Sequence, residues 1–203
     1  MTCYHSTFLK RAKNNPDTNS TPDRSAGKRV LVLVDESNLL SSVRAVSRNL
    51  DWIKLRDFVV RPDDGRVLIE MVVYAGLPPA MPEWQAERDK KNKFLHWLRS
   101  NGFLVMAKDG APVQENLYKA NVDVLMAIDT IELTNAMQPD VVVLVTGDSD
   151  FAPLALHLRR RGIRVEAAST LAVLGTALRG AANEVIDLLP LFESCEVLKA
   201  PGA

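Results

Sequence analysis

Residues 141–150 read VVVLVTGDSD, and this stretch decides the fold. Its first five residues are all aliphatic, which predicts a strand that is buried on both faces near the centre of a parallel sheet. The strand leads within a few residues into two acids, Asp148 and Asp150. A second run of this kind, residues 29–34 (RVLVLV), leads directly into Asp35. The sequence thus contains two buried strands that each end in acid.

Further apolar runs alternate with segments of helical periodicity around these two strands. We expect strands at residues 66–74, 103–106 and 163–167, and helices at 39–50, 81–99, 121–133, 151–160 and 171–178. The segment 121–133 is apolar around most of its circumference, which predicts a well-buried helix. Strands that alternate with helices favour βαβ units, so we expect an α/β fold with a doubly wound, mostly parallel sheet.

The chain length and composition suit a single globular domain with tails. It has 203 residues, of which 47% are hydrophobic and 25% charged, and its formal net charge is zero. Residues 1–27 are rich in Asn, Ser, Thr, Pro and basic residues, so we expect a disordered N-terminal extension there. The domain should cover residues 28–192, and a C-terminal tail should cover 193–203. A neutral chain gives no bulk signal for a nucleic-acid partner.

Several features of the sequence predict a soluble, cytoplasmic protein without a membrane partner. Cys3 and Cys195 are too few for a disulfide framework and lack metal-ligand spacing, which fits a reducing compartment. No apolar run reaches the roughly 18 residues needed to cross a bilayer. The first residues also lack the apolar region of a signal peptide.

The acids that follow the two buried strands should meet at one edge of the sheet. In open parallel sheets, ligands bind beyond the carboxyl ends of the strands. Each acid also has a structural interpretation, because Asp commonly caps the helix that follows. A helix needs only one cap, however, so capping leaves one of the pair Asp148 and Asp150 without an explanation. The cluster therefore favours a functional site.

Asp123 is the third element of the expected site. It lies near the start of an otherwise apolar helix, where the helix dipole alone would favour an acid. Asp129 follows six residues later, about 240° around the helix. Because the two side chains point in different directions, we expect only Asp123 to face the sheet edge that carries Asp35, Asp148 and Asp150. We call this edge, with Asp123, the acidic edge.

Carboxylates that gather at a sheet edge repel one another unless a cation neutralises them. Oxygen ligands favour Mg²⁺ or Mn²⁺ over zinc, and the three histidines, His5, His96 and His157, form no competing set. Asp35, Asp123, Asp148 and Asp150 are therefore the predicted metal ligands and catalytic residues. Four further polar residues lie close to them in the sequence and are predicted to position a substrate: Asn38, Lys119, Thr146 and Ser149. Such a site suits hydrolysis at phosphorus.

Three blocks of the sequence resemble the signature of a known family. Residues 35–38 (DESN) follow a buried strand, Lys119 precedes residues 122–124 (VDV), and residues 146–151 (TGDSDF) precede a helix. In this order and at these separations they resemble the NYN domain, in the LabA-like branch of the PIN-like ribonuclease superfamily. The resemblance covers residues 29–190 and includes the late segment 182–187 (ANEVID).

This resemblance implies a Rossmann-like α/β/α sandwich and metal-dependent hydrolysis of RNA phosphodiester bonds. Asp35, Asp123 and Asp148 match the metal-holding acids of the family, Asp150 matches a fourth, and Asn38 matches its first-block asparagine. The chain departs from the family pattern at Asn121, where a glycine is usual. We therefore expect Mg²⁺ or Mn²⁺ as cofactor and single-stranded RNA as partner, and a homodimer or a protein partner is possible.

The sequence features that could bind RNA are local groups of basic and aromatic residues. Residues 159–161 (RRR) and the lysines at 90, 91 and 93 could contact phosphate, and Trp84 or Trp97 could stack on bases. Each also has an ordinary interpretation as a solvated face or a core residue.

Two alternatives lead to different functions. A regulatory NYN module that binds RNA or protein, with weak or absent catalysis, would keep the same fold and the same acids. A haloacid-dehalogenase-like phosphatase would use Asp35 as nucleophile, but it needs a second acid two residues later, where this chain has Ser37.

Overall fold

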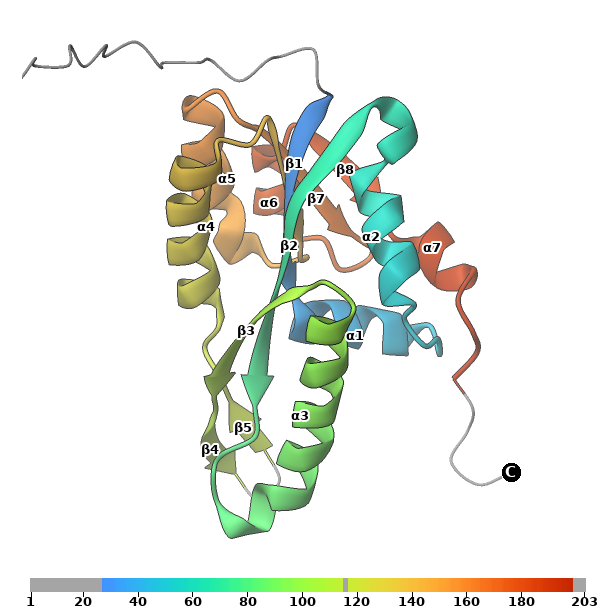
Figure 1. Ribbon diagram of the computed structural model, residues 1–203, viewed down its shortest axis with the longest axis vertical. Coiled ribbons are helices and arrows are strands. Elements are labelled where there is room, and N and C mark those ends of the chain that lie inside the picture. The colour runs from blue at the N-terminus through green and yellow to red at the C-terminus, as the bar shows by residue number, and fades with distance from the viewer. Residues whose placement is uncertain (1–26, 115–116, 199–203) are drawn as a thin grey trace, which may run out of the picture.

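A six-stranded parallel sheet forms the centre of the protein (Figure 1). The structure is a computed structural model that describes residues 27–114 and 117–198. In spatial order the strands are β3 (Leu104–Asp109), β2 (Arg66–Leu77), β1 (Lys28–Asp35), β6 (Val141–Val145), β7 (Arg164–Ser169) and β8 (Glu184–Asp187). Every neighbouring pair is parallel. The predicted α/β fold with a parallel sheet is confirmed.

The chain changes direction across the sheet between β1 and β6. From β1 it builds outward through β2 to β3, then returns to β6 and continues through β7 to β8. This places the two most hydrophobic strands side by side at the topological switch point, where parallel sheets bind ligands. Both strands end toward the same edge because they run parallel.

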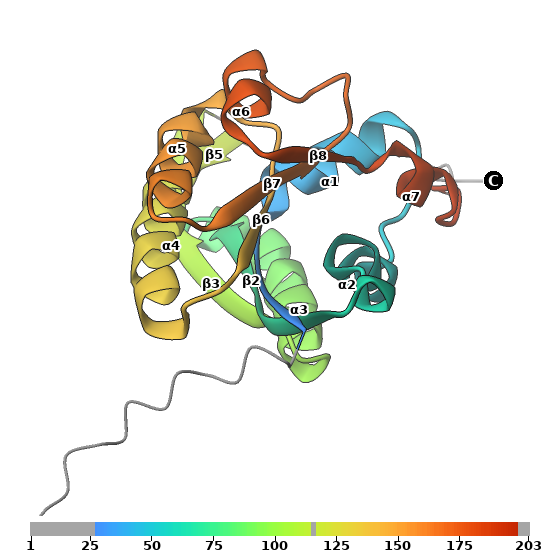
Figure 2. The same ribbon diagram turned by 90° about the horizontal axis from the view of Figure 1, so that it is seen from above.

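Helices cover both faces of the sheet, as the view from above shows (Figure 2). One face packs against α1 (Glu36–Ala45), α2 (Trp52–Val60), α3 (Gln85–Ser100) and α7 (Leu189–Glu193). The other packs against α4 (Asp123–Met137), α5 (Ala152–Arg160) and α6 (Thr176–Ala181). Alternate residues of β1 serve the two cores, with Val32 in the first and Leu33 in the second. Three 3-10 turns complete the elements: η1 (Pro62–Asp64), η2 (Pro82–Trp84) and η3 (Ser149–Phe151).

Some predicted helix boundaries were wrong, and local capping explains the differences. We expected a helix over residues 39–50, but α1 begins at Glu36 because the carboxylate of Asp35 caps it. The second helix of this region, α2, was not predicted, and Asp51 caps it in the same way. The helix expected from residue 171 begins only at Thr176, after Gly175.

The helix that we expected to be well buried is only half buried. Met126 and Thr130 of α4 face the sheet and are fully buried. On the opposite side, Val124 is 63% exposed, Ile128 52% and Ile131 36%. An apolar circumference predicted burial on every side, but the described residues of the chain cover only one face of α4.

On one side of the switch point, the chain continues beyond the carboxyl edge of the sheet into an unpredicted hairpin that forms a separate small sheet. The last residue of β1, Asp35, pairs with Tyr74, whereas β2 continues for three more residues and pairs with β3 as far as Asp109. A two-stranded antiparallel hairpin of β4 (Ala111–Gln114) and β5 (Leu117–Lys119) follows directly. The hairpin stands beside α3 beyond the carboxyl edge of the sheet (Figure 1).

Residues near the two ends of the described chain lie against the domain. The predicted N-terminal extension, apart from Gly27, lies outside the described residues, as do residues 199–203 of the C-terminal tail. Cys195 is buried after α7, and Val197 forms an antiparallel bridge with Arg48. Among the described residues, no helix combines the length and apolarity that crossing a membrane requires.

A buried cluster of ion pairs joins β2 to β7. The side chain of Glu166 is fully buried and accepts hydrogen bonds from Arg66 (2.8 and 2.9 Å), Arg164 (2.8 Å) and Arg61 (2.7 Å). Burial alone would raise the pKa of Glu166, but the hydrogen bonds and charges of the arginines outweigh it and hold this pKa at about 2. The cluster keeps Glu166 ionised inside the protein.

Candidate functional site

Asp35 is the most deeply buried of the four predicted acids. It is the last residue of β1 and only 4% exposed. One carboxylate oxygen accepts hydrogen bonds from the Ser37 hydroxyl (2.9 Å) and from the backbone N–H of Asn38 (3.1 Å). The hydroxyl of Thr146 lies 3.4 Å from the other oxygen. Asp35 is therefore both a helix cap and a buried carboxylate at the switch point.

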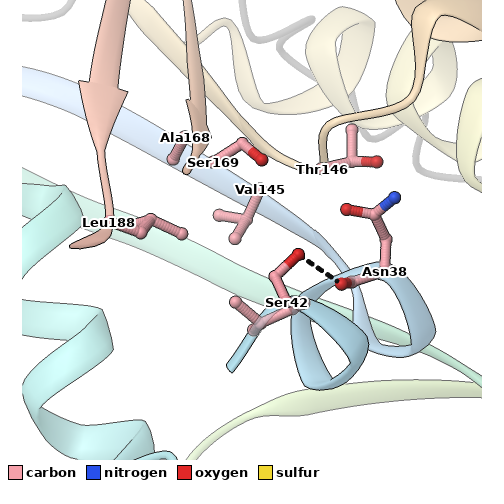
Figure 3. Close-up of a pocket in the computed structure, with 8 residues that line it drawn as sticks. Asn38, Ser42, Val145, Thr146, Ala168, Ser169 and Leu188 are labelled. Carbon is pink, nitrogen blue, oxygen red and sulfur yellow. Dashed lines mark hydrogen bonds between the residues drawn. The ribbon is translucent and has the colours of Figure 1, made fainter. Parts of the chain in front are cut away.

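Two side chains connect the end of β1 to the end of β6. The side-chain oxygen of Asn38 accepts a hydrogen bond from the Gly147 N–H (2.9 Å), and the Thr146 hydroxyl accepts one from the Asp148 N–H (3.2 Å). The crevice behind Asn38 has no space for a water molecule (Figure 3). Ser42 lines this crevice, and its hydroxyl donates a hydrogen bond to the backbone carbonyl of Asn38. Asn38 and Thr146, two of the four predicted positioning residues, thus hold the loop after β6 in place.

Glycines in this loop allow close backbone approach. A side-chain carbon at Gly147 would lie 2.7 Å from the Val173 carbonyl oxygen and 2.9 Å from the Ser169 hydroxyl. A carbon at Gly175 would lie 2.0 Å from the hydroxyl of Ser149. The Gly175 N–H donates to the Gly147 carbonyl at 2.8 Å, which closes the contact between the two segments. The close contacts of Gly147 therefore require a glycine at the centre of the Thr-Gly-Asp motif.

Asp148 and Asp150 have different local roles. The Asp148 carboxylate accepts a hydrogen bond from the Asp150 N–H (2.9 Å) and caps the turn η3. Asp150 caps no helix and is exposed. Capping therefore accounts for Asp148 but leaves Asp150 without a structural role.

Asp123 completes the set from the opposite face of the sheet. It is the first residue of α4 and is partly buried. Burial raises the pKa of Asp123, the nearby charges of Asp35 and Asp148 raise it further, Lys119 lowers it, and Asp150 raises it slightly. These interactions place Asp35, Asp148, Asp150 and Lys119 within electrostatic reach of Asp123.

Asp129 lies elsewhere, as its position on the helix suggested. Burial raises the pKa of Tyr74 on β2, and the charge of Asp129 raises it further. The Tyr74 side chain is fully buried and Asp129 is half-buried, so Asp129 lies within electrostatic reach of β2. Asp129 is not among the charges that shift the pKa of Asp123.

The donor set suits a hard cation, but the carboxylates are not drawn together around one point. None of the ion pairs among the described residues involves Asp35, Asp123, Asp148 or Asp150, so their mutual repulsion is not offset by a basic side chain in contact. In residues 27–114 and 117–198, no three acidic, His or Cys side chains are close enough to surround a metal ion. Asp35 and Asp148 instead direct oxygens to neighbouring N–H and hydroxyl groups. Binding a cation would require these carboxylates to turn toward one another.

Glu36 and Lys91 form a buried pair beside the site that sequence reasoning missed. The Glu36 carboxylate accepts a hydrogen bond from Lys91 of α3 at 2.5 Å, and Glu36 is 2% exposed. Burial raises the pKa of Tyr118 in the hairpin, and the charge of Glu36 raises it further. The pair therefore joins α1 to α3, and the charge of Glu36 acts on the hairpin. Its members are 55 positions apart, so the pair leaves no local signal in the sequence.

Comparison with known proteins gives a family and a similar solved fold. The family model described as the NYN domain matches residues 29–189. Among solved structures, the chain resembles a protein of unknown function from Vibrio parahaemolyticus, with 25% sequence identity and a TM-score of 0.62. That match covers 80% of this chain and 94% of the other. No curated protein matches.

The family match contains every residue of the acidic edge. It begins at the second residue of β1 and ends after β8, so it includes all six parallel strands. The fold is consistent with the PIN-like superfamily, whereas membership of the LabA-like branch stays a prediction. The chain belongs to the NYN domain family.

Proposed function

We propose that this protein is a metal-dependent ribonuclease that hydrolyses phosphodiester bonds of single-stranded RNA at the acidic edge. The observation that supports the proposal is that Asp35 of β1 and Asp148 and Asp150 of the loop after β6 act electrostatically on Asp123 at the start of α4, at the switch point of an NYN fold. A structural role alone does not require four acids at one place, because like charges destabilise the folded state.

Asp35, Asp123, Asp148 and Asp150 would hold Mg²⁺ or Mn²⁺. Such an ion supplies charge stabilisation at phosphorus and lowers the pKa of a bound water. The buried Asp35 and the turn-capping Asp148 accept hydrogen bonds from their own loops, and these bonds would reorganise around the ion. Asp150 is exposed and can rotate toward a substrate.

The other predicted positioning residues lie where a substrate phosphate would approach. Lys119 is exposed at the end of the hairpin, within electrostatic reach of Asp123. Ser149 lies between Asp148 and Asp150 in the turn η3. Lysine can bind a phosphate as a point charge, whereas the acids would be repelled by RNA without a cation. We expect this activity in the cytoplasm, because the cysteine pattern fits a reducing compartment.

The proposal is tested with a fluorescently labelled single-stranded RNA and Mn²⁺. We expect cleavage that EDTA stops and that Asp148→Asn reduces by at least about a hundredfold, since removal of a metal-holding charge weakens both the site and its chemistry. Asp129→Asn is the matched control, because Asp129 lies on the same helix as Asp123 and is not among the charges that shift the pKa of Asp123. Equal cleavage by wild type and Asp148→Asn would disprove the proposal. RNA binding that needs no metal, with no cleavage, would instead favour a regulatory NYN module.

A further inference from the structure

The exposed face of α4 carries a continuous apolar stripe. Val124, Ile128 and Ile131 are 63%, 52% and 36% exposed and follow one another at spacings of four and three residues. At about 100° per residue they lie within one narrow sector, opposite the buried Met126 and Thr130. Leu156 on the neighbouring helix α5 is a further exposed apolar side chain, at 45%.

A helix that is apolar on both faces is normally covered on both faces. Three large aliphatic side chains in a row on a solvent-facing helix are costly to leave in water and mark a protein interface. Isolated exposed residues such as Val67, at 53%, need no such explanation. The sequence prediction of a well-buried α4 would hold for an assembly in which another surface covers this stripe.

The charges at the two ends of the stripe are opposite. At its N-terminal end lie Asp123 and the acidic edge, whose carboxylates make no ion pair among the described residues. At its C-terminal end, the guanidinium of Arg161 donates to the side-chain oxygen of Asn135, and Arg160 is exposed beside it. A surface with an apolar centre, an acidic end and a basic end is complementary to an inverted copy of itself.

We propose that the protein forms a homodimer in which α4 packs antiparallel against α4 of a second copy. A two-fold axis between Ile128 and Ile131 brings Ile128 against Ile131 of the partner copy and Val124 against Asn135 of the partner copy. This is the isologous contact expected of a symmetric dimer. A parallel arrangement would instead place acid against acid and arginine against arginine.

The antiparallel dimer has a consequence for the acidic edge. Arg161 of the partner copy would lie near Val124, one residue from Asp123, and would bring a basic group to each acidic site. The dimer itself does not depend on the proposed ribonuclease activity. The two proposals can therefore fail separately.

The oligomeric state tests the interface. Light scattering of the full chain over a concentration series should give twice the chain mass of 22.4 kDa. Ile128→Lys should raise the dissociation constant by at least about thirtyfold, because it places a charge at the centre of the interface. Val67→Lys is the matched control, since Val67 is exposed to the same degree on β2. Circular dichroism should show both variants folded, as both sites face solvent. A monomer at every concentration, or a dimer that Ile128→Lys leaves intact, would overturn the proposal.

Cysteine cross-linking tests the direction of packing. In a Cys3→Ser background, the double variant Val124→Cys with Asn135→Cys should form a disulfide-linked dimer under mild oxidation. Val124→Cys alone should not, because two copies of this residue would lie roughly 16 Å apart along antiparallel helices. Cross-linking by the single variant as efficient as by the double variant would show parallel packing and contradict the proposed arrangement.

Discussion

The side-chain oxygen of Asn38 accepts a hydrogen bond from the backbone N–H of Gly147 at 2.9 Å. This contact joins the first turn of α1 to the loop after β6, across the topological switch point. Asp35 lies three residues before Asn38 and Asp148 follows Gly147, so this contact ties together the two segments that carry these acids. Asn38 therefore has a structural role in positioning the segments that carry the acids. This role does not depend on a contact between Asn38 and a substrate.

Replacement of Asn38 by alanine should loosen the acidic edge. The Gly147 N–H lies in a buried segment, and the loss of its acceptor should lower the free energy of unfolding by about 1–3 kcal/mol. Displacement of Asp148 should also reduce Mn²⁺-dependent RNA cleavage roughly tenfold to a hundredfold. Urea denaturation and initial cleavage rates measure the two effects. Ser41→Ala, at an exposed position of the same helix, should change neither.

Gly147→Ala should destabilise the protein, because the added methyl group would overlap the Val173 carbonyl oxygen and the Ser169 hydroxyl. We expect a loss of about 1–3 kcal/mol in the free energy of unfolding. Gly180→Ala in α6 is the matched control, since no atom lies within 4 Å of the added carbon. It should instead raise stability by about 0.4–1 kcal/mol. Similar destabilisation by both changes would show that the close contacts of Gly147 are not the cause.

Stability should fall in acid as Glu166 becomes protonated. The pKa of Glu166 is held at about 2 in the folded protein, whereas an unperturbed glutamate has a pKa of 4.5. A carboxyl group with a lowered folded-state pKa stabilises the protein fully above the unfolded pKa, and this contribution disappears as the pH falls through the folded pKa. The loss should occur between about pH 4.5 and pH 2 and amount to about 3 kcal/mol. Urea titrations across this range measure it.

Glu166→Gln provides the comparison for this pH dependence. The variant should be less stable at neutral pH by about 3–5 kcal/mol, because Arg66 is left buried without its carboxylate partner. Its stability should vary less with pH in the same window. A variant that keeps the full acid sensitivity of the wild type would assign that sensitivity to other carboxyl groups.

The sequence was most informative where a strand is buried on both faces. The runs that became β1 and β6 could be identified because uninterrupted aliphatic residues leave no other explanation. The acids that follow them, Asp35 and Asp148, were placed at one edge because parallel strands end together. The prediction that Asp123 and Asp129 point in different directions followed from helix geometry alone.

Long-range contacts explain what the sequence did not reveal. The hairpin of β4 and β5 is short and exposed, so it has little apolar alternation, and residues 111–114 carry no buried side chain. The pair of Glu36 and Lys91 and the cluster around Glu166 join residues that lie far apart in the chain. The exposure of α4 could not be predicted either, because periodicity shows which residues are apolar and not which faces are covered.

Anomalous diffraction from a crystal soaked in Mn²⁺ is the most direct measurement of the acidic site. We predict a manganese peak within about 2.0–2.6 Å of carboxylate oxygens from Asp35 and Asp148, with Asp123 or Asp150 in the same coordination shell. The same soak of Asp148→Asn should lose the peak while the fold stays unchanged. Manganese bound away from these four carboxylates, or absent from a well-ordered acidic edge at saturating Mn²⁺, would contradict a metal site at the switch point.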